Sequence, residues 1–478
     1  MIQLYMKHIT LLAAALLAAA CTVKAPAPYG PCPTPAQVEW QRMETNLFIH
    51  FGPNTFSGKE WGDGTEPEDI FNPTDMDCSQ WAQVARDAGF KGVILTAKHH
   101  DGFCLWPNPV SRHTVKQSDW KNGEGDVLKD LSEACAQYGL KLGVYISPWD
   151  RFDPHYGTPE YNQVFEQTLR SALSGYGPVF EQWFDGACGE GPNGKRQEYD
   201  WPLYHKTVFE LQPDAVIFGD TGPGCRWVGN ERGVAGRTSW STYDTKGFVP
   251  GIEGPKREAK NEGVRGGEFW VPSESDVSIR PGWFWRASEN EQVKSLQELL
   301  GIYYTSVGRN SLLLLNVPPD TRGRIHEADS ARLLEWRRGL DRIFATDLAQ
   351  GGTVKASSRR GRAFSESALL EEDYHRYWAV PDQDLTPSVT LTLPEERSFN
   401  RIVLQEYIPL GQRVAAFEVE VRKDGEWVQV AKETTIGYKR ILLIPSVTAD
   451  AVRIHITEAD ACPVLNRLAL YMDDIYRP

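Results

Sequence analysis

The stretch GVILTAKHHDGF (residues 92–103) decides the fold of this chain, because an apolar run of strand length ends in a cluster of polar side chains. Residues 126–138 (DVLKDLSEACAQY) follow it and place apolar side chains such as Val127 and Leu131 at helical spacing. A second apolar run, KLGVYI, occupies residues 141–146. Two short apolar strands joined by an amphipathic helix predict a βαβ unit with parallel strands.

The same alternation of short apolar runs and helical patterns continues over residues 36–348. The strand candidates are Leu47–Phe51, Gly92–Ala97, Lys141–Ile146, Gln182–Phe184, Ala215–Phe218, a weak one near Thr238–Tyr243, Glu268–Val271 and Leu312–Leu315. Further helices are expected over Trp81–Ala88 and Glu289–Val307. Eight strands with helices between them predict a (β/α)8 barrel. An open doubly wound sheet is the alternative, and it is disfavoured because no Gly-rich phosphate loop follows the first strand.

Beyond the barrel, residues 349–478 change to a period-two pattern. Residues 389–393 (VTLTL), 417–421 (FEVEV) and 452–456 (VRIHI) alternate apolar and polar side chains, as half-buried strands do. A helix over Glu327–Leu348 would form the boundary. We therefore expect α/β architecture followed by a C-terminal all-β sandwich.

The N-terminus has the pattern of an export signal. Leu11–Ala20 is an apolar run too short to span a bilayer, and Cys21 follows its small residues. Residues 1–21 resemble a bacterial lipoprotein signal in which Cys21 is lipidated, and ordinary signal-peptidase cleavage is the alternative. The Pro-rich residues 22–35 are expected to form a tether. These features predict an exported protein of the periplasm or outer membrane, or a soluble secreted one.

Composition narrows the classes of partner. The net charge of −13 disfavours nucleic acids and anionic membranes, which need a basic surface, so any membrane contact is expected through the anchor alone. Sixteen Trp residues are a mild indication of carbohydrate binding. If Cys21 is lipidated, seven of the eight Cys remain, and none has the CxxC spacing of a zinc site.

Polar side chains follow the predicted strands, where barrel enzymes place their active residues. Asp185 ends an apolar strand, and an unpaired carboxylate is costly to bury there without a role. His50, His99 and His100 are candidate metal ligands, although neighbouring side chains on a strand end point in opposite directions. A metal-dependent barrel hydrolase is therefore one alternative.

The motifs in combination are more specific. HFG (50–52), KHHDGF (98–103), WFDG (183–186) and NSLLLLNVPP (310–319) together resemble the α-L-fucosidases of glycoside hydrolase family 29. WVGNERG (227–233) and SDVSIRPGWF (275–284) resemble the subgroup that prefers α-1,3 and α-1,4 linkages on branched glycans. Residues 402–414 (IVLQEYIPLGQRV) are similar to a discoidin-like β-sandwich.

This resemblance implies a retaining exo-fucosidase acting on branched, Lewis-type fucosylated oligosaccharides, without cofactor or metal. It assigns Asp185 as nucleophile and Glu231 as acid/base; Glu253, Glu268 and Glu274 compete for the second role. The residues expected to bind substrate are His50, Glu60, Trp61, His99, His100, Tyr145, Trp149, Arg237 and Trp283. A broad-specificity fucosidase and a non-catalytic glycan-binding lipoprotein are competing interpretations of the same motifs.

Overall fold

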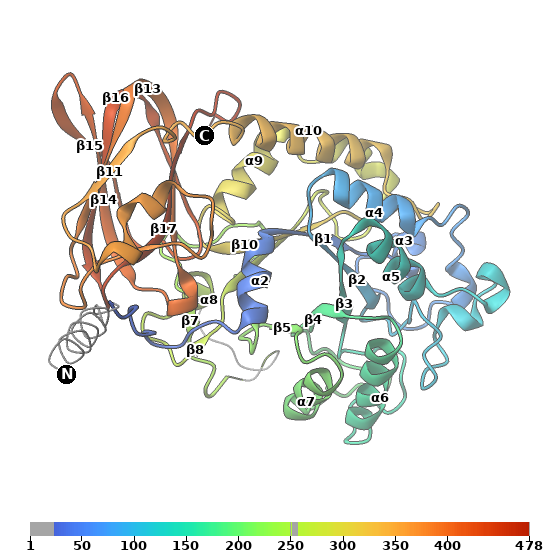
Figure 1. Cartoon of the computed structure of the whole chain (residues 1–478). Coiled ribbons are helices and arrows are strands. Elements are labelled where there is room, and N and C mark those ends of the chain that lie inside the picture. The colour runs from blue at the N-terminus through green and yellow to red at the C-terminus, as the bar shows by residue number, and fades with distance from the viewer. Residues whose placement is uncertain (1–22, 249, 251–256, 478) are drawn as a thin grey trace, which may run out of the picture.

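The computed structural model describes residues 23–248, 250 and 257–477, which form a barrel and a β-sandwich side by side (Figure 1). The expected signal segment and Cys21 lie outside the described residues. Within the described part of the chain, no helix is both long and apolar enough to cross a bilayer. The seven cysteines of this part are free thiols.

Eight parallel strands close into the barrel. They are β1 (Thr45–Ile49), β2 (Gly92–Lys98), β3 (Lys141–Ile146), β4 (Val179–Trp183), β5 (Val216–Gly219), β6 (Cys225–Trp227), β9 (Ser273–Ser278) and β10 (Ser311–Asn316). Strand β1 pairs in parallel with both β2 and β10, which completes the ring in the order β1-β10-β9-β6-β5-β4-β3-β2. The predicted barrel is confirmed.

The sixth and seventh strands were placed wrongly from the sequence. Residues near Thr238–Tyr243 and Glu268–Val271 instead supply β7 (Thr242–Tyr243) and β8 (Phe269–Trp270), a separate antiparallel pair. The sixth barrel strand, β6, has only three residues. The seventh, β9, reads SESDVS and is fully buried. Its polar side chains gave no apolar run to detect.

Several helices pack around the barrel. The helices are, in chain order, α2 (Pro35–Met43), α3 (Pro53–Ser57), α4 (Cys78–Asp87), α5 (Val127–Tyr138), α6 (Tyr161–Ser174), α7 (Trp201–Leu211), α8 (Arg257–Glu262), α9 (Leu296–Thr305) and α10 (Glu327–Ile343). Helix α2 covers the end of the barrel at the strand starts, where Trp40 and Met43 pack with residues of the barrel interior. Helix α5 begins where the Asp126 side chain accepts from the backbone N–H of Lys129, and it ends at Gly139 in the left-handed region. The expected helix from Glu289 is interrupted, because Ser295 caps α9 afresh.

The C-terminal domain is antiparallel. Its strands are β11 (Thr353–Ala356), β12 (Trp378–Ala379), β13 (Ser388–Glu406), β14 (Val414–Lys423), β15 (Glu426–Glu433), β16 (Arg440–Ala459) and β17 (Val464–Tyr471). The long strands β13 and β16 pair along most of their length with irregularities in register, so they bend around a common apolar core. Asp424 and Gly425 make the β14–β15 turn with positive φ, as a tight hairpin turn requires.

The Pro-rich segment before α2 lies against the sandwich. The backbone N–H of Tyr29 donates to Leu410 O at 3.0 Å. Arg413 donates to Ala27 O at 2.6 Å, and Arg360 donates to Lys24 O at 2.6 Å. From residue 24 onward the expected tether is therefore bonded to the C-terminal domain, as its path beside the sandwich in Figure 1 also shows.

Candidate active site

The site is built at the carboxyl ends of the first four strands. His50 follows β1, and His99 and His100 follow β2. Tyr145 lies near the end of β3. The ring centroids of His50 and His99 are 5.8 Å apart, those of His99 and His100 are 4.1 Å apart, and the Tyr145 ring stacks on His99 at 5.9 Å. The closed barrel therefore gathers side chains from three strands into one pocket.

Asp185 lies two residues beyond β4, within this pocket. Its Oδ2 accepts from the Tyr145 hydroxyl at 3.0 Å, and its Oδ1 accepts from the backbone N–H of Ala187 at 2.8 Å. His100 Nε2 lies 3.7 Å from Oδ2. Burial raises the pKa of Asp185, while these two donors favour its charged form. The side chain keeps 28% of its exposure, so it can reach a bound substrate.

Glu231 enters the pocket from the loop after β6. The Asn230 side chain shapes this loop, accepting from the N–H of Arg232 at 3.1 Å and donating to Val234 O at 2.8 Å. Arg232 also forms a β-bridge with Val277 of β9. Glu231 is exposed, and its Oε2 accepts from Trp283 Nε1 at 3.3 Å. An exposed carboxyl held at the mouth can exchange a proton with solvent and with a leaving group.

Three neutral imidazoles line the pocket. Burial lowers the pKa of His50 and of His100 to about 3, and lowers that of His99 well below its ordinary value. His50 Nδ1 lies 2.8 Å from Asn316 Oδ1, so Nδ1–H donates a hydrogen bond to this oxygen and Nε2 is left as an acceptor. His99 Nδ1 is buried without a protein partner in the described residues. Neutral imidazoles of this kind can exchange hydrogen bonds with sugar hydroxyls.

Aromatic rings form the walls around the imidazoles. Trp149 lies 4.8 Å from His100, and Trp283 lies 5.0 Å from His50, measured between ring centroids. Trp61 contacts Trp149 edge to face at 5.8 Å and is 57% exposed. Flat, partly exposed rings beside hydrogen-bonding groups suit a ligand with both apolar and hydroxylated faces.

Glu60, which was expected to bind substrate, also connects two loops around the pocket. Its Oε1 accepts from the backbone N–H of Trp283 at 2.6 Å, and its Oε2 pairs with Arg286. The loop after β1 is thereby joined to the loop after β9. Glu60 thus holds in place the same Trp283 that contacts Glu231.

Arg237, which was expected to bind substrate, lies outside the pocket. Arg237 Nε donates to Glu433 of β15 at 2.8 Å, so its contacts belong to the interface with the sandwich and not to the pocket. Among the competitors for the acid role, Glu274 is fully buried inside the barrel, and Glu268 is exposed beside the β7–β8 pair. Glu253 lies outside the described residues.

The sequence missed Asp276, a carboxyl close to the reacting groups. It lies on β9 and accepts from Trp227 Nε1 at 2.8 Å. Burial and then the nearby charge of Glu231 raise its pKa well above the ordinary value, and the charge of Asp185 adds to this. Alternate residues of SESDVS face into the barrel, so Asp276 could have been identified as an inward-facing carboxyl if this segment had been recognised as strand β9.

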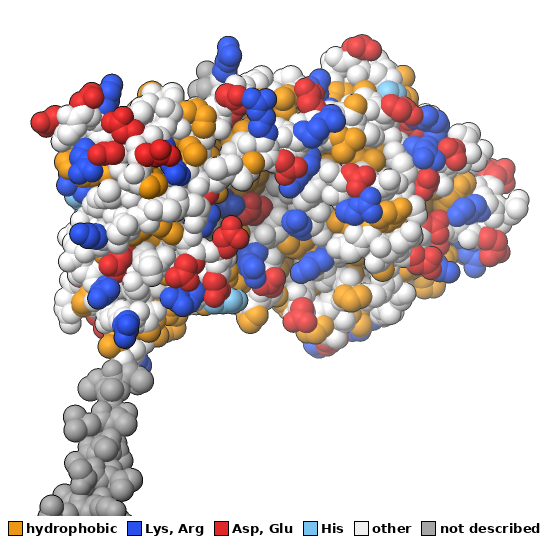
Figure 2. Space-filling view, turned by 45° about the horizontal axis from the view of Figure 1, so that its top comes forward, with side chains coloured by type: hydrophobic (Ala, Val, Ile, Leu, Met, Phe, Trp, Pro, Cys, Tyr) orange, Lys and Arg blue, Asp and Glu red, His pale blue; other side chains and the backbone are white. Residues whose placement is uncertain are grey.

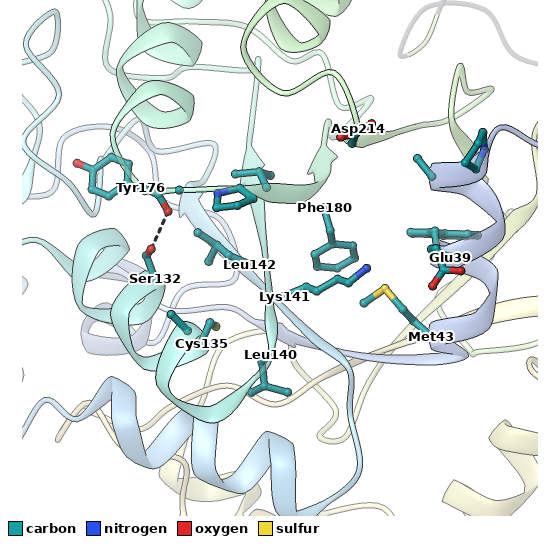
Figure 3. A pocket seen from close by; sticks show the side chains of 17 residues that line it. Glu39, Met43, Ser132, Cys135, Leu140, Lys141, Leu142, Tyr176, Phe180 and Asp214 are labelled. Atoms are coloured by element: carbon teal, nitrogen blue, oxygen red, sulfur yellow. Dashed lines mark hydrogen bonds between the residues drawn. The ribbon is translucent and has the colours of Figure 1, made fainter.

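The pocket is distinct from an apolar cavity of about 630 Å³ at the other end of the barrel (Figure 3). Leu142 near the start of β3, Phe180 of β4 and Met43 of α2 line this cavity. None of the expected site residues lines it.

Acidic and basic side chains are interspersed over the face shown in Figure 2, without a continuous basic surface there.

Comparison with known proteins identifies the family. The family model described as alpha-L-fucosidase matches residues 29–340. Alpha-L-fucosidase 1 of Arabidopsis thaliana is 44% identical over 455 residues, which is 94% of this chain and 89% of that protein. The chain belongs to the α-L-fucosidase family. It is a glycoside hydrolase with fucosylated glycans as its class of substrate.

Solved structures support the same assignment for the whole fucosidase. A Ruminococcus gnavus GH29 fucosidase in complex with fucose has a TM-score of 0.88 at 33% identity, covering 94% of this chain and 96% of its own. A family 29 glycoside hydrolase from a rumen bacterium has a TM-score of 0.84 at 38% identity, covering 94% and 79%. Residues 353–469 match the F5/8 type C domain, which confirms the discoidin-like sandwich.

Proposed function

We propose that this fucosidase works by a retaining mechanism, with Asp185 as nucleophile and Glu231 as acid/base. The observation that carries the proposal is the unequal setting of the two carboxyls. Asp185 is enclosed and receives two hydrogen bonds that favour its charged form, whereas Glu231 is exposed at the mouth beside one indole N–H. A carboxylate kept ionised and a second carboxyl free to exchange protons are the two groups that a retaining glycosidase requires.

In the first step, an Asp185 oxygen forms a bond to the anomeric carbon as the bond from that carbon to the leaving oxygen breaks. Glu231 gives its proton to the leaving oxygen. In the second step, Glu231 takes a proton from water, whose oxygen bonds to the anomeric carbon and releases Asp185. The neutral imidazoles of His50, His99 and His100 would hold the fucose hydroxyls throughout. A site built to bond hydroxyls rejects analogues that lack them.

Proton NMR of the first product tests the stereochemistry. Hydrolysis of an aryl α-L-fucoside should release α-L-fucose first, with the β anomer forming later by mutarotation. Initial release of β-L-fucose would contradict the retaining mechanism and reassign the role of Asp185.

We further propose that the enzyme prefers α-1,3- and α-1,4-linked fucose on branched glycans. The loop after β6 supports this, because it contacts both β9 and the loop that follows β9: Arg232 forms a β-bridge with Val277 of β9, and Trp283 donates to Glu231. A sugar beyond the fucose would contact this shared wall. Binding energy from that remote sugar can then be used to orient the reacting centre.

The linkage test compares three substrates side by side: a Lewis-type trisaccharide, an α-1,2-fucosylated disaccharide and an aryl α-L-fucoside. The trisaccharide should have the highest kcat/KM and the α-1,2-linked sugar should be poor. Equal or reversed preference would move the enzyme to the broad-specificity subgroup.

Export with lipidation at Cys21 is a separate proposal. A Cys21→Ser variant should lose metabolic labelling by fatty acid.

A further inference from the structure

A pair of carboxyl groups lies inside the barrel beneath the pocket. Glu181 of β4 and Glu274 of β9 are both fully buried. Their strands are not neighbours, since β5 and β6 separate them in the barrel, so the two side chains meet across its interior. One oxygen of each carboxyl and the Cys225 sulfur of β6 all lie within 4.8 Å of one another.

The hydrogen bonds around this pair leave two acceptors facing each other. Glu181 Oε2 accepts from Trp40 Nε1 at 2.7 Å, and Glu274 Oε1 accepts from Trp183 Nε1 at 2.8 Å. The Cys225 thiol lies 3.8 Å from Glu181 Oε1. Glu274 Oε2 is buried without a donor among the described residues. Ionised carboxylates accept hydrogen bonds but cannot donate them. One of the two carboxyls must therefore carry a proton if their facing oxygens are to be hydrogen-bonded to each other.

No cationic side chain of the described part of the chain acts on the pair as a counter-ion. Trp40 of α2 and Trp183 of β4 are neutral, Cys225 is the thiol from β6, and Asp276 of β9 adds a further acid. Burial raises the pKa of Glu181 to about 7, and burial together with the charge of Glu181 raises that of Glu274 well above its ordinary value. Two like charges in a buried site cannot both be retained at low cost.

Trp183 connects this pair to the reacting carboxylate. Glu181, Trp183 and Asp185 alternate along one side of β4 and its extension, so they rise from the barrel interior to the mouth. The Trp183 ring stacks on Phe218 at 3.8 Å and on Tyr145 at 5.1 Å. The Tyr145 hydroxyl donates to Asp185.

We propose that Glu181 and Glu274 share a proton, and that Glu274 is a positioning residue that orients Asp185 through Trp183 and Tyr145. The positioning part rests on Asp185 being the nucleophile, whereas the shared proton does not. Glu274 fixes the indole N–H, the indole supports the Tyr145 ring, and that ring carries the hydroxyl bonded to the nucleophile. The barrel interior thus contributes to catalysis without touching substrate.

The proton is tested with Glu274→Gln, and Glu268→Gln is the control on an exposed carboxyl. The amide can accept from Trp183 and donate to Glu181, so it imitates the protonated acid. A carboxyl with a raised folded pKa binds more protons when folded, so its folded state loses stability as pH rises from the unfolded pKa toward the folded one. The melting temperature of Glu274→Gln relative to wild type should therefore increase from acidic to mildly alkaline pH, while Glu268→Gln tracks wild type.

Infrared spectroscopy gives an independent reading of the same proton. Wild type in D₂O at neutral pH should show C=O absorption from protonated, buried carboxyls. The difference spectrum between wild type and Glu274→Gln should show the loss of one of them, since Asp276 can contribute another. A pH-independent difference in melting temperature together with an unchanged C=O absorption would overturn the shared proton. So would one equivalent of divalent metal in the purified enzyme that Glu274→Gln fails to retain, because the pair would then hold a cation.

The positioning role is tested with Glu274→Leu, which removes the acceptor of Trp183. Its kcat on an aryl fucoside should fall by ~10- to 100-fold with little change in KM, while Glu274→Gln stays within about threefold of wild type. Equal activity of the folded Leu and Gln variants would refute the positioning role. If Glu274→Leu does not fold, Glu274→Gln tests the positioning role by itself. Its amide still accepts from Trp183, so a loss of kcat as large as ~100-fold in this folded variant would refute the positioning role. Failure of Asp185 as nucleophile would leave the infrared result standing.

Discussion

The hydrogen bond from Tyr145 to Asp185 can be tested by substituting Tyr145→Phe. The change removes one hydroxyl and keeps the ring, which stacks on His99 and Trp183. The lost bond is 3.0 Å long and stabilises the charged form of the carboxylate. Hydrogen bonds to charged groups contribute about 1.5–3 kcal/mol, and ~1.4 kcal/mol corresponds to one pKa unit. Because Asp185 keeps its bond from Ala187, we expect its pKa to rise by about one unit.

The assay is the pH dependence of kcat/KM for an aryl α-L-fucoside. Asp185 must be ionised to attack, so activity is lost as pH falls through its pKa, which already lies above the ordinary carboxyl value. In Tyr145→Phe this acidic limb should move to higher pH by about one unit. Tyr161→Phe is the matched control, since that buried hydroxyl donates to Pro148 O at 2.9 Å and not to a carboxylate. An acidic limb that stays in place, or moves to lower pH, would refute the reasoning.

Three further predictions concern single residues. Asp185→Ala should fold and lose several orders of magnitude in kcat, as measured on purified protein, because no other group can form the covalent intermediate. Glu231→Ala should slow hydrolysis of an aryl fucoside and be partly rescued by azide, which needs no general base; if Glu268→Ala shows this behaviour instead, the acid/base has been misassigned. Arg237→Ala should leave kcat/KM unchanged and lower the free energy of unfolding by less than about 1 kcal/mol, because the Arg237 side chain is 64% exposed and Glu433 keeps its pair with Arg440; a large loss of activity in the folded variant would return Arg237 to the pocket.

The sequence predicted the apolar elements of the fold better than the polar ones. Strands β2 and β3 were placed closely because their apolar runs are continuous, as buried parallel strands require. Strand β9 was missed because its inward residues Glu274 and Asp276 belong to the interior beneath the pocket. A strand that carries functional groups on its buried side has no hydrophobic signal to read.

The site residues that follow apolar strands could also be predicted better than a residue whose partner is distant in sequence. His50, His99, His100 and Asp185 follow strands whose ends could be predicted, and the structure brings them together. Arg237 was expected in the pocket, but it pairs with Glu433, which lies 196 residues away in another domain. Long-range pairing of this kind depends on how the domains pack, which periodicity along the chain does not encode.

The bonds between residues 24–29 and the C-terminal domain have a consequence for the order of folding. As the chain emerges from the ribosome, β1 must wait for its partner β10, since Thr45 pairs with Leu313. Residues 24–29 form their hydrogen bonds later still, because their partners Leu410 and Arg413 are made later. The barrel can therefore close only after about two-thirds of the polypeptide has been made, and residues 24–29 are fixed only after more than four-fifths of it. Slow closure of such distant contacts makes a nascent chain that stops short of the sandwich a target for proteases at its N-terminal segment.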